Sequence, residues 1–290
     1  MNKTDGYILT NGINTYYKIM GEGEPIIVVH GGPGMAHNYL VPKFSRLAKN
    51  YKLVFYDQRA CGKTNGEEYP AQITINNLVK DLKDLIGELG VEKINLVGQS
   101  FGGLIALNYA IKHQNNLKSL IILESAPASS EYEDEFENTI MERLNKKEKE
   151  KQLRLKNSEK FKNLHTETHI EYYLSLFKAY FYDKSYHKEL NFNYFTKKML
   201  KKNAISDPMF DKYIKDYDIY DKLKKITCPT LIIHGKYDPI PYQSIVRVHK
   251  CIAESELILF ERCGHFAHIE KKEKYFNAIE KFLLKNSIKN

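Results

Sequence analysis

Short apolar runs alternate with amphipathic stretches in the first and last thirds of the chain. Residues 26–29 and 94–97 have the length and β-branched content of strands buried on both faces of a sheet. Residues 75–89 instead repeat apolar side chains at helical spacing. The alternation predicts an α/β fold with a parallel, doubly wound sheet. Predicted strands cover residues 7–10, 13–19, 26–29, 53–56, 94–97, 117–123, 230–233 and 257–260, and predicted helices cover 39–49, 75–89, 104–113, 242–252 and 272–284.

The middle of the chain interrupts this alternation. Residues 127–225 lack runs typical of buried strands and are rich in Lys, Glu, Tyr and Phe. They predict several amphipathic helices inserted into the sheet. We therefore expect a core of residues 1–126 and 226–290 and a helical cap at 127–225. The concentration of Tyr and Phe in residues 172–195 predicts an aromatic roof over a pocket.

The composition indicates a globular protein rather than a disordered one. Of 290 residues, 42% are hydrophobic and 12% are aromatic. The N-terminus lacks the apolar segment of a signal peptide, and no run approaches the roughly 18 apolar residues of a membrane helix. The four cysteines form no CxxC pair and no disulfide-framework spacing. We expect a soluble, cytoplasmic protein with free thiols and no membrane partner.

The formal net charge of +8 raises the question of nucleic-acid binding. The positive residues are mostly lysines that lie among glutamates, as in residues 146–151. This alternation is typical of a solvated helix face and not of a basic groove. Nucleic acid is therefore not an expected partner.

The first chemical signal lies between the predicted strand at 94–97 and the helix that follows. Gly98, Ser100 and Gly102 form a G-x-S-x-G pattern, which in a strand–turn–helix context predicts a nucleophile elbow. Such a sharp turn strains the backbone of the serine and brings strand and helix close together. Side chains at the two flanking positions would clash, which explains the glycines.

Two further residues follow predicted strands and complete a constellation with Ser100. Asp238 comes shortly after residues 230–233, and His265 comes shortly after residues 257–260. Taken singly, Asp238 is better explained as a cap of the next helix, and His265 as a surface histidine. Their strand-end placement in the order Ser, Asp, His favours a catalytic triad.

Each predicted site residue has a chemical task. Neutral His265 removes the Ser100 proton near pH 7, and Asp238 orients the imidazole. The oxyanion of the tetrahedral intermediate needs preorganised donors, and the backbone N–H groups of Gly32 and Phe101 are the candidates. Glycines within residues 31–34, including Gly31, let the backbone approach substrate. This chemistry requires no metal and no cofactor.

Two other groups of residues invite a functional interpretation. Asp57 and Arg59 follow a predicted strand, and we interpret them as a loop-stabilising ion pair near the site. His165 and His169 have the i, i+4 spacing of zinc proteases. Those sites need Glu directly after the first His, whereas Glu167 stands one place later. We expect this segment to be a solvated cap helix.

Three motifs give the chain a wider resemblance. Residues 30–34 read His-Gly-Gly-Pro-Gly, residues 56–64 read Tyr-Asp-Gln-Arg-Ala-Cys-Gly-Lys-Thr, and residues 98–103 read Gly-Gln-Ser-Phe-Gly-Gly. Over nearly its full length the chain resembles α/β-hydrolases, and more narrowly the proline iminopeptidases. The resemblance implies an eight-stranded core, a helical cap, the triad and oxyanion donors named above, and cleavage of an N-terminal residue, often proline, from short peptides.

The chain departs from the family pattern at three positions. Ala60 and Thr64 replace Gly and Ser of the usual loop, and Pro239 stands where several members carry an acidic residue that binds the substrate amine. A substrate ammonium in a partly dry cleft needs an anionic partner. The remaining carboxylates that are candidates for this task are Glu124, Asp207 and Asp211.

These departures leave more than one function open. The first hypothesis is a serine aminopeptidase of the proline iminopeptidase type. The second keeps the triad but changes the substrate to an ester, a thioester or a lactone, because Pro239 removes an amine anchor. Epoxide hydrolases and dehalogenases are disfavoured because they carry Asp where Ser100 stands. A ligand receptor on a hydrolase fold is disfavoured by the complete triad and oxyanion loop.

Overall fold

The computed structural model describes residues 3–213 and 216–287. An eight-stranded sheet runs in the order β1-β2-β4-β3-β5-β6-β7-β8. β1 and β2 form an antiparallel hairpin that continues onto β4, and all other neighbours pair in parallel. The predicted mostly parallel α/β sheet is confirmed. The strands are β1 (Lys3–Thr10), β2 (Ile13–Met20), β3 (Glu24–Val29), β4 (Tyr51–Tyr56), β5 (Ile94–Gln99), β6 (Leu117–Leu123), β7 (Thr230–Gly235) and β8 (Ser255–Phe260).

The helices follow the predicted alternation, except for the one expected at residues 39–49. That segment forms a single α-helical turn followed by a 3-10 turn at Ser45–Lys49. The Asn50 N–H donates to Leu47 O (3.1 Å), three residues earlier, which is the hydrogen-bond pattern of a 3-10 turn and not of an α-helix. The α-helices are α1 (Val41–Phe44), α2 (Ile75–Glu88), α3 (Phe101–His113), α4 (Glu133–Arg143), α5 (Lys146–Lys156), α6 (Glu159–Lys162), α7 (Thr166–Leu176), α8 (Lys197–Tyr213), α9 (Tyr220–Leu223), α10 (Tyr242–Cys251), α11 (Ala267–Glu270) and α12 (Lys272–Ser287).

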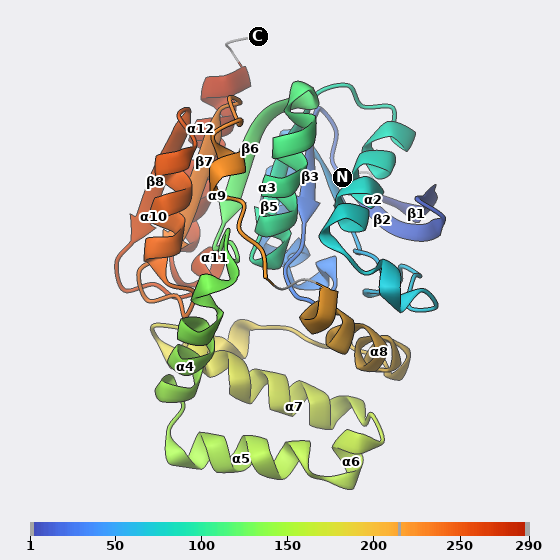
Figure 1. Cartoon of the computed structure of the whole chain (residues 1–290), viewed down its shortest axis with the longest axis vertical. Coiled ribbons are helices and arrows are strands. Elements are labelled where there is room, and N and C mark those ends of the chain that lie inside the picture. Colours follow the sequence, from blue (N-terminus) through green and yellow to red (C-terminus); the bar gives the residue numbers. More distant parts are fainter. Residues whose placement is uncertain (1–2, 214–215, 288–290) are drawn as a thin grey trace.

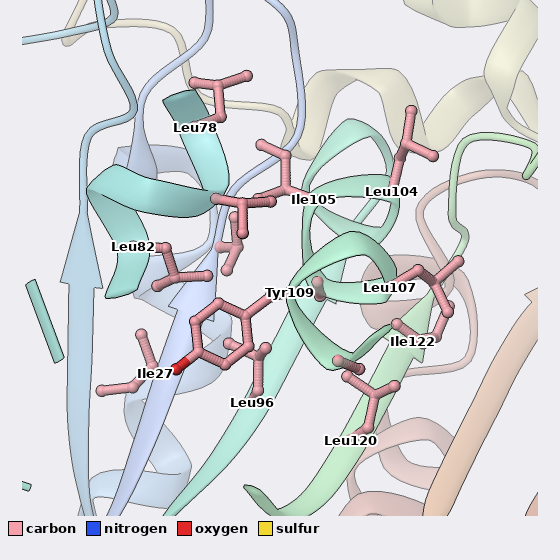
Figure 2. Close-up of a cluster of buried hydrophobic side chains, with 14 of the residues drawn as sticks. Ile27, Leu78, Leu82, Leu96, Leu104, Ile105, Leu107, Tyr109, Leu120 and Ile122 are labelled. Atoms are coloured by element: carbon pink, nitrogen blue, oxygen red, sulfur yellow. The ribbon is translucent and has the colours of Figure 1, made fainter. Parts of the chain in front are cut away.

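Helices cover both faces of the sheet. On one face α2, α3 and α10 bury apolar side chains against β3, β5 and β6. Figure 2 shows this layer, in which Leu104, Ile105 and Tyr109 of α3 lie over Leu96 and Leu120 of the sheet. On the other face α1 and α12 pack against the alternate side chains of the same strands. The central strands are apolar along their whole length because helices cover both faces of the sheet and exclude water from it.

The segment between β6 and β7 leaves the sheet and returns to it at the same place. Ser129 pairs with Asp218 in an isolated antiparallel bridge, and Ile219 N donates to Ala128 O (2.9 Å). Between these ends, α4 to α8 form a layer beyond one end of the sheet (Figure 1). No helix in residues 3–213 or 216–287 combines the length and apolar content needed to span a bilayer.

Candidate active site

Ser100 occupies the turn between β5 and α3. Its φ of 56° lies in the left-handed region, so the backbone is strained there. A Cβ at Gly98 would meet the Gly102 carbonyl oxygen, and a Cβ at Gly102 would meet the Val29 carbonyl oxygen. The expectation that both glycines are needed for close approach is therefore confirmed.

The structure brings the three residues of the predicted triad together. His265 Nε2 lies 3.0 Å from Ser100 Oγ, and His265 Nδ1 lies 2.8 Å from Asp238 Oδ2. Asp238 follows β7 and His265 follows β8, so both side chains start from the carboxyl ends of adjacent strands. Asp238 and His265 are buried, while Ser100 is partly exposed. A hydroxyl, an imidazole and a carboxylate in this chain can activate the hydroxyl as a nucleophile.

Local hydrogen bonds hold the carboxylate and the imidazole in place. Asp238 Oδ1 accepts the N–H of Ile240 (2.9 Å), so the aspartate caps its own turn while Oδ2 faces His265. His265 donates its backbone N–H to Tyr180 O (2.7 Å), which belongs to the inserted segment. Behind the pair, burial lowers the pKa of His234, whose ring nitrogen lies 3.7 Å from Asp238 Oδ2. The His234 ring is therefore neutral near pH 7 and does not compete as a charged partner.

The loop after β3 lies against the nucleophile. Gly32 lines the same cavity as Ser100, and Phe101 begins α3. Gly31 donates its N–H to Tyr39 Oη (2.7 Å), and a Cβ at Gly31 would lie 2.8 Å from the Ser100 Cβ. The N–H of Gly31 is thus used inside the protein, while the glycine lets this loop approach the serine.

His30 holds this loop from behind. Its Nε2 accepts the N–H of Gln58 (3.1 Å), so Nδ1 is the donor to Gly31 O (2.6 Å). Burial lowers the pKa of His30 to about 4. A neutral imidazole is required for this pattern, because a protonated ring has no acceptor.

A cavity of about 250 Å³ lies between Ser100 and the inserted segment. Its lining is mostly aromatic and aliphatic, and Tyr173, Phe177 and Phe192 come from the segment expected to form an aromatic roof. That expectation is confirmed. The cavity is lined by Gly32, Pro33, Met35, Tyr39, Gln99, Ser100, Phe136, Tyr173, Leu176, Phe177, Tyr180, Leu190, Phe192, Ile240, His265 and Phe266.

Two of the acidic residues predicted to bind a substrate amine, Glu124 and Asp207, do not line this cavity. Glu124 is fully buried at the end of β6, where Tyr275 Oη donates to its Oε2 (3.4 Å). Burial, together with the nearby charge of Asp238, raises the pKa of Glu124 well above its usual range. Asp207 lies on α8 against Gly34, and the side chain of Asp211 lies outside the described residues.

The interpretation of Asp57 and Arg59 as an ion pair with each other is wrong. Asp57 instead accepts from His37 Nδ1 (2.7 Å) and from the backbone N–H of Lys63 (2.9 Å). Arg59 forms a bidentate pair with Asp81 of α2, at 2.6 and 2.9 Å. The side chains of Asp57 and Arg59 therefore bind different partners that are distant in sequence, His37 and Asp81.

The two histidines with zinc-protease spacing do not form a metal site. His169 stacks on Phe161, with ring centroids 3.8 Å apart, and its Nε2 lies 3.0 Å from Phe161 O. His165 is half exposed and lies 3.2 Å from Glu167. Throughout residues 3–213 and 216–287, no group of three His, Cys, Asp or Glu side chains is arranged to hold a metal ion.

Sequence reasoning missed several side chains beside the site. Tyr39 bridges Gly31 and Gln99, and its hydroxyl donates to Gln99 Oε1 (2.5 Å). Arg143 of α4 reaches the loop that carries Asp238. Gln99 could have been noticed within the elbow, and Arg143 is one of two arginines among the lysines of residues 127–225. Tyr39 carries no signal in the sequence, since only the fold brings it to the elbow.

Known proteins resemble this chain in sequence over nearly its whole length. The family model of the alpha/beta hydrolase fold matches residues 24–272. A proline iminopeptidase of Saccharolobus solfataricus is 32% identical over 289 residues, which cover 98% of this chain and 93% of the relative. A proline iminopeptidase of Thermoplasma volcanium is 30% identical and covers 97% of both chains.

Solved structures agree on the fold. A proline iminopeptidase of Mycobacterium smegmatis superposes with a TM-score of 0.72 at 22% identity and covers 98% of this chain and 99% of its own. A meta-cleavage product hydrolase of Pseudomonas fluorescens gives a TM-score of 0.71 at 22% identity, with 97% of each chain covered. At this identity the structures support the fold alone, whereas the closer sequence relatives carry the narrower assignment. The chain therefore belongs to the α/β-hydrolase fold family and, within it, to the proline iminopeptidases.

Proposed function

We propose that this protein is a serine aminopeptidase that releases an N-terminal residue, proline in particular, from short peptides. The observation that carries the proposal is the hydrogen-bonded chain from Ser100 through His265 to Asp238, of which Ser100 and His265 line the cavity. The relatives named proline iminopeptidase support the substrate class.

In the proposed mechanism, His265 Nε2 takes the Ser100 proton as Oγ forms a bond to the scissile carbonyl carbon. The backbone N–H groups of Gly32 and Phe101 stabilise the oxyanion of the tetrahedral intermediate. The C–N bond then breaks as His265 gives its proton to the leaving amine. Water, deprotonated by His265, hydrolyses the acyl-enzyme and restores Ser100. Asp238 stabilises the imidazolium throughout.

The test is a paired assay with proline β-naphthylamide and its N-acetylated form. We expect turnover of the free-amine substrate only, since an aminopeptidase recognises the N-terminus. Ser100→Ala should lower kcat by at least about 1,000-fold, because the nucleophile is removed. Undiminished turnover by Ser100→Ala would contradict the assignment of the nucleophile.

One observation favours a second candidate, an esterase, thioesterase or lactonase with the same triad. Among the described residues that line the cavity, none is Asp or Glu. A neutral, apolar acyl group suits such a lining better than an ammonium does. Turnover of p-nitrophenyl acetate without turnover of proline β-naphthylamide would favour this candidate over the aminopeptidase.

Two further proposals concern the whole chain. Residues 127–225 act as a cap that closes the cavity over a core of residues 1–126 and 226–290, a division supported by the roof residues Tyr173 and Phe177. We also place the enzyme in the cytoplasm, because all four of its cysteines are free thiols. Cell fractionation tests this location.

A further inference from the structure

We propose that Arg143, at the end of α4, is a positioning residue. Its side chain extends from the cap and fixes the position of the Asp238 loop relative to the His265 loop. The inference rests on the proposed function, because it assigns Arg143 a role in the same triad. Arg143 is half-buried. Among the described residues, its hydrogen bonds go to backbone carbonyls and not to Ser100 or the imidazole of His265. Its effect is therefore exerted through the two loops.

The guanidinium donates to three backbone carbonyl groups. Nη1 donates to Tyr237 O (2.6 Å) and to Ala179 O (3.2 Å), and Nη2 lies 3.4 Å from Asp238 O. Two of these carbonyls belong to the triad aspartate and the residue before it. The planar group also lies over the Tyr237 ring, 3.8 Å from its centroid. Together these contacts fix the backbone from which the Asp238 side chain projects.

The third carbonyl connects the same guanidinium to His265. Ala179 and Tyr180 are consecutive residues of the 3-10 turn at Phe177–Tyr180, and Tyr180 O accepts the backbone N–H of His265 (2.7 Å). One side chain therefore ties together the two segments that carry the acid and the base of the triad. The His265 Nδ1 to Asp238 Oδ2 hydrogen bond (2.8 Å) depends on this relative placement.

The chemistry of the contacts requires arginine. A rigid fork reaches several carbonyls while its flat face stacks on a ring, and a lysine ammonium cannot do both. The backbone of Arg143 is itself held, because Lys184 Nζ donates to Arg143 O (2.6 Å) and pairs with Glu148 (3.2 Å). Lys184 thus stabilises the same corner of the cap without contacting Tyr237, Ala179 or Asp238.

The experiment compares Arg143→Ala, Arg143→Lys and wild type on whichever substrate the wild-type protein hydrolyses. We expect Arg143→Ala to lower kcat by about tenfold to a hundredfold with KM changed less than about twofold, because small misplacements of catalytic groups cost rates of this size. Arg143→Lys should recover only part of the loss. Added guanidinium chloride, below the concentration that unfolds the protein, should raise the kcat of Arg143→Ala and leave wild type unchanged.

Lys151→Ala is the control for general loosening of the cap, because Lys151 of α5 pairs with Glu171 of α7 (2.7 Å) and not with Arg143. Arg154→Ala, an exposed arginine on α5, is the control for loss of positive charge. Both should keep kcat within about twofold of wild type, as expected of changes away from the triad loops. An equal loss of kcat in Lys151→Ala, or a wild-type kcat in Arg143→Ala, would overturn the inference. Failure of the proposed function is recognised separately in the wild-type protein. It would then hydrolyse p-nitrophenyl acetate but not proline β-naphthylamide, or its Ser100 would not react with a fluorophosphonate.

Discussion

At the scale of single residues, Glu124 shows how burial changes what a carboxyl group can do. The side chain lies behind the triad, fully buried, with Tyr275 as a hydrogen-bond donor. Burial and the charge of Asp238 raise the pKa of Glu124 well above its usual range, which favours the protonated form. A carboxyl group that does not line the cavity is a poor anchor for a substrate ammonium. We infer that Glu124 supports the site rather than binding substrate.

Glu124→Gln tests this inference, because an amide matches a neutral carboxyl in shape. We expect kcat/KM to change less than about tenfold, since the neutral hydrogen bond at stake is worth about 1 kcal/mol. A carboxyl whose pKa is raised in the folded state loses stability as the pH rises above its ordinary value of 4.5. The stability of Glu124→Gln relative to wild type should therefore increase from pH 5 to pH 8 in urea unfolding. A large increase in KM confined to free-amine substrates would identify Glu124 as the amine anchor instead.

At the scale of elements, the Arg59–Asp81 pair joins three parts of the core. Arg59 lies in the loop after β4, Asp81 lies on α2, and Asn11 of the β1–β2 turn donates to Asp81 Oδ1 (3.0 Å). Both charged side chains are almost completely buried. Such a pair holds the position of α2 against the hairpin, since removing one partner leaves the other charge unsolvated.

Asp81→Ala should therefore destabilise the protein by about 3–5 kcal/mol, as expected for an orphaned buried charge. Urea unfolding measures this loss. Lys80→Ala, an exposed change on the same helix, is the matched control and should stay within about 0.5 kcal/mol of wild type. Equal unfolding midpoints for the two variants would show that the ion pair contributes nothing to stability.

The elements that could be predicted from sequence are those whose signal is local. The strand at residues 94–97, the elbow glycines and the strand-end positions of Asp238 and His265 each follow from a run of neighbouring residues. The partners of Asp57 and Arg59 could not be predicted, because His37 and Asp81 reach them only after α2 and the loop after β3 have packed on the sheet. The helix expected at 39–49 is divided, because residues 45–49 form the i→i+3 hydrogen bonds of a 3-10 turn, which the spacing of apolar residues does not reveal.

At the scale of the whole molecule, two buried histidines make stability depend on pH. Burial lowers the pKa of His30 to about 4 and that of His268 to about 3, from an ordinary value of 6.5. Their contribution is complete above pH 6.5, where folded and unfolded chains both hold them neutral. Below that pH the two histidines bind protons in the unfolded chain but not in the folded chain, so the free energy of unfolding falls.

We expect the unfolding free energy to decrease between pH 6.5 and about pH 4, by up to about 1.4 kcal/mol per pH unit for each histidine. His268→Gln should remove the contribution of His268 to this pH dependence of the unfolding free energy, whatever the effect of the substitution on stability at pH 7. Urea unfolding at several pH values measures both slopes. Identical slopes for the variant and wild type would show that His268 binds a proton in the folded state.

The bridge between Ser129 and Asp218 has a consequence for the history of the protein. Because the inserted segment departs and returns at one point, a single genetic exchange can replace it without altering the order of the strands. The contact of Arg143 with the Asp238 loop sets a condition on such an exchange. An exchanged segment would be combined with the existing nucleophile, Ser100. It would also have to supply a side chain that supports the Asp238 loop, as Arg143 does here. An exchange of this segment that changes substrate specificity is therefore expected to change the turnover rate of the enzyme as well.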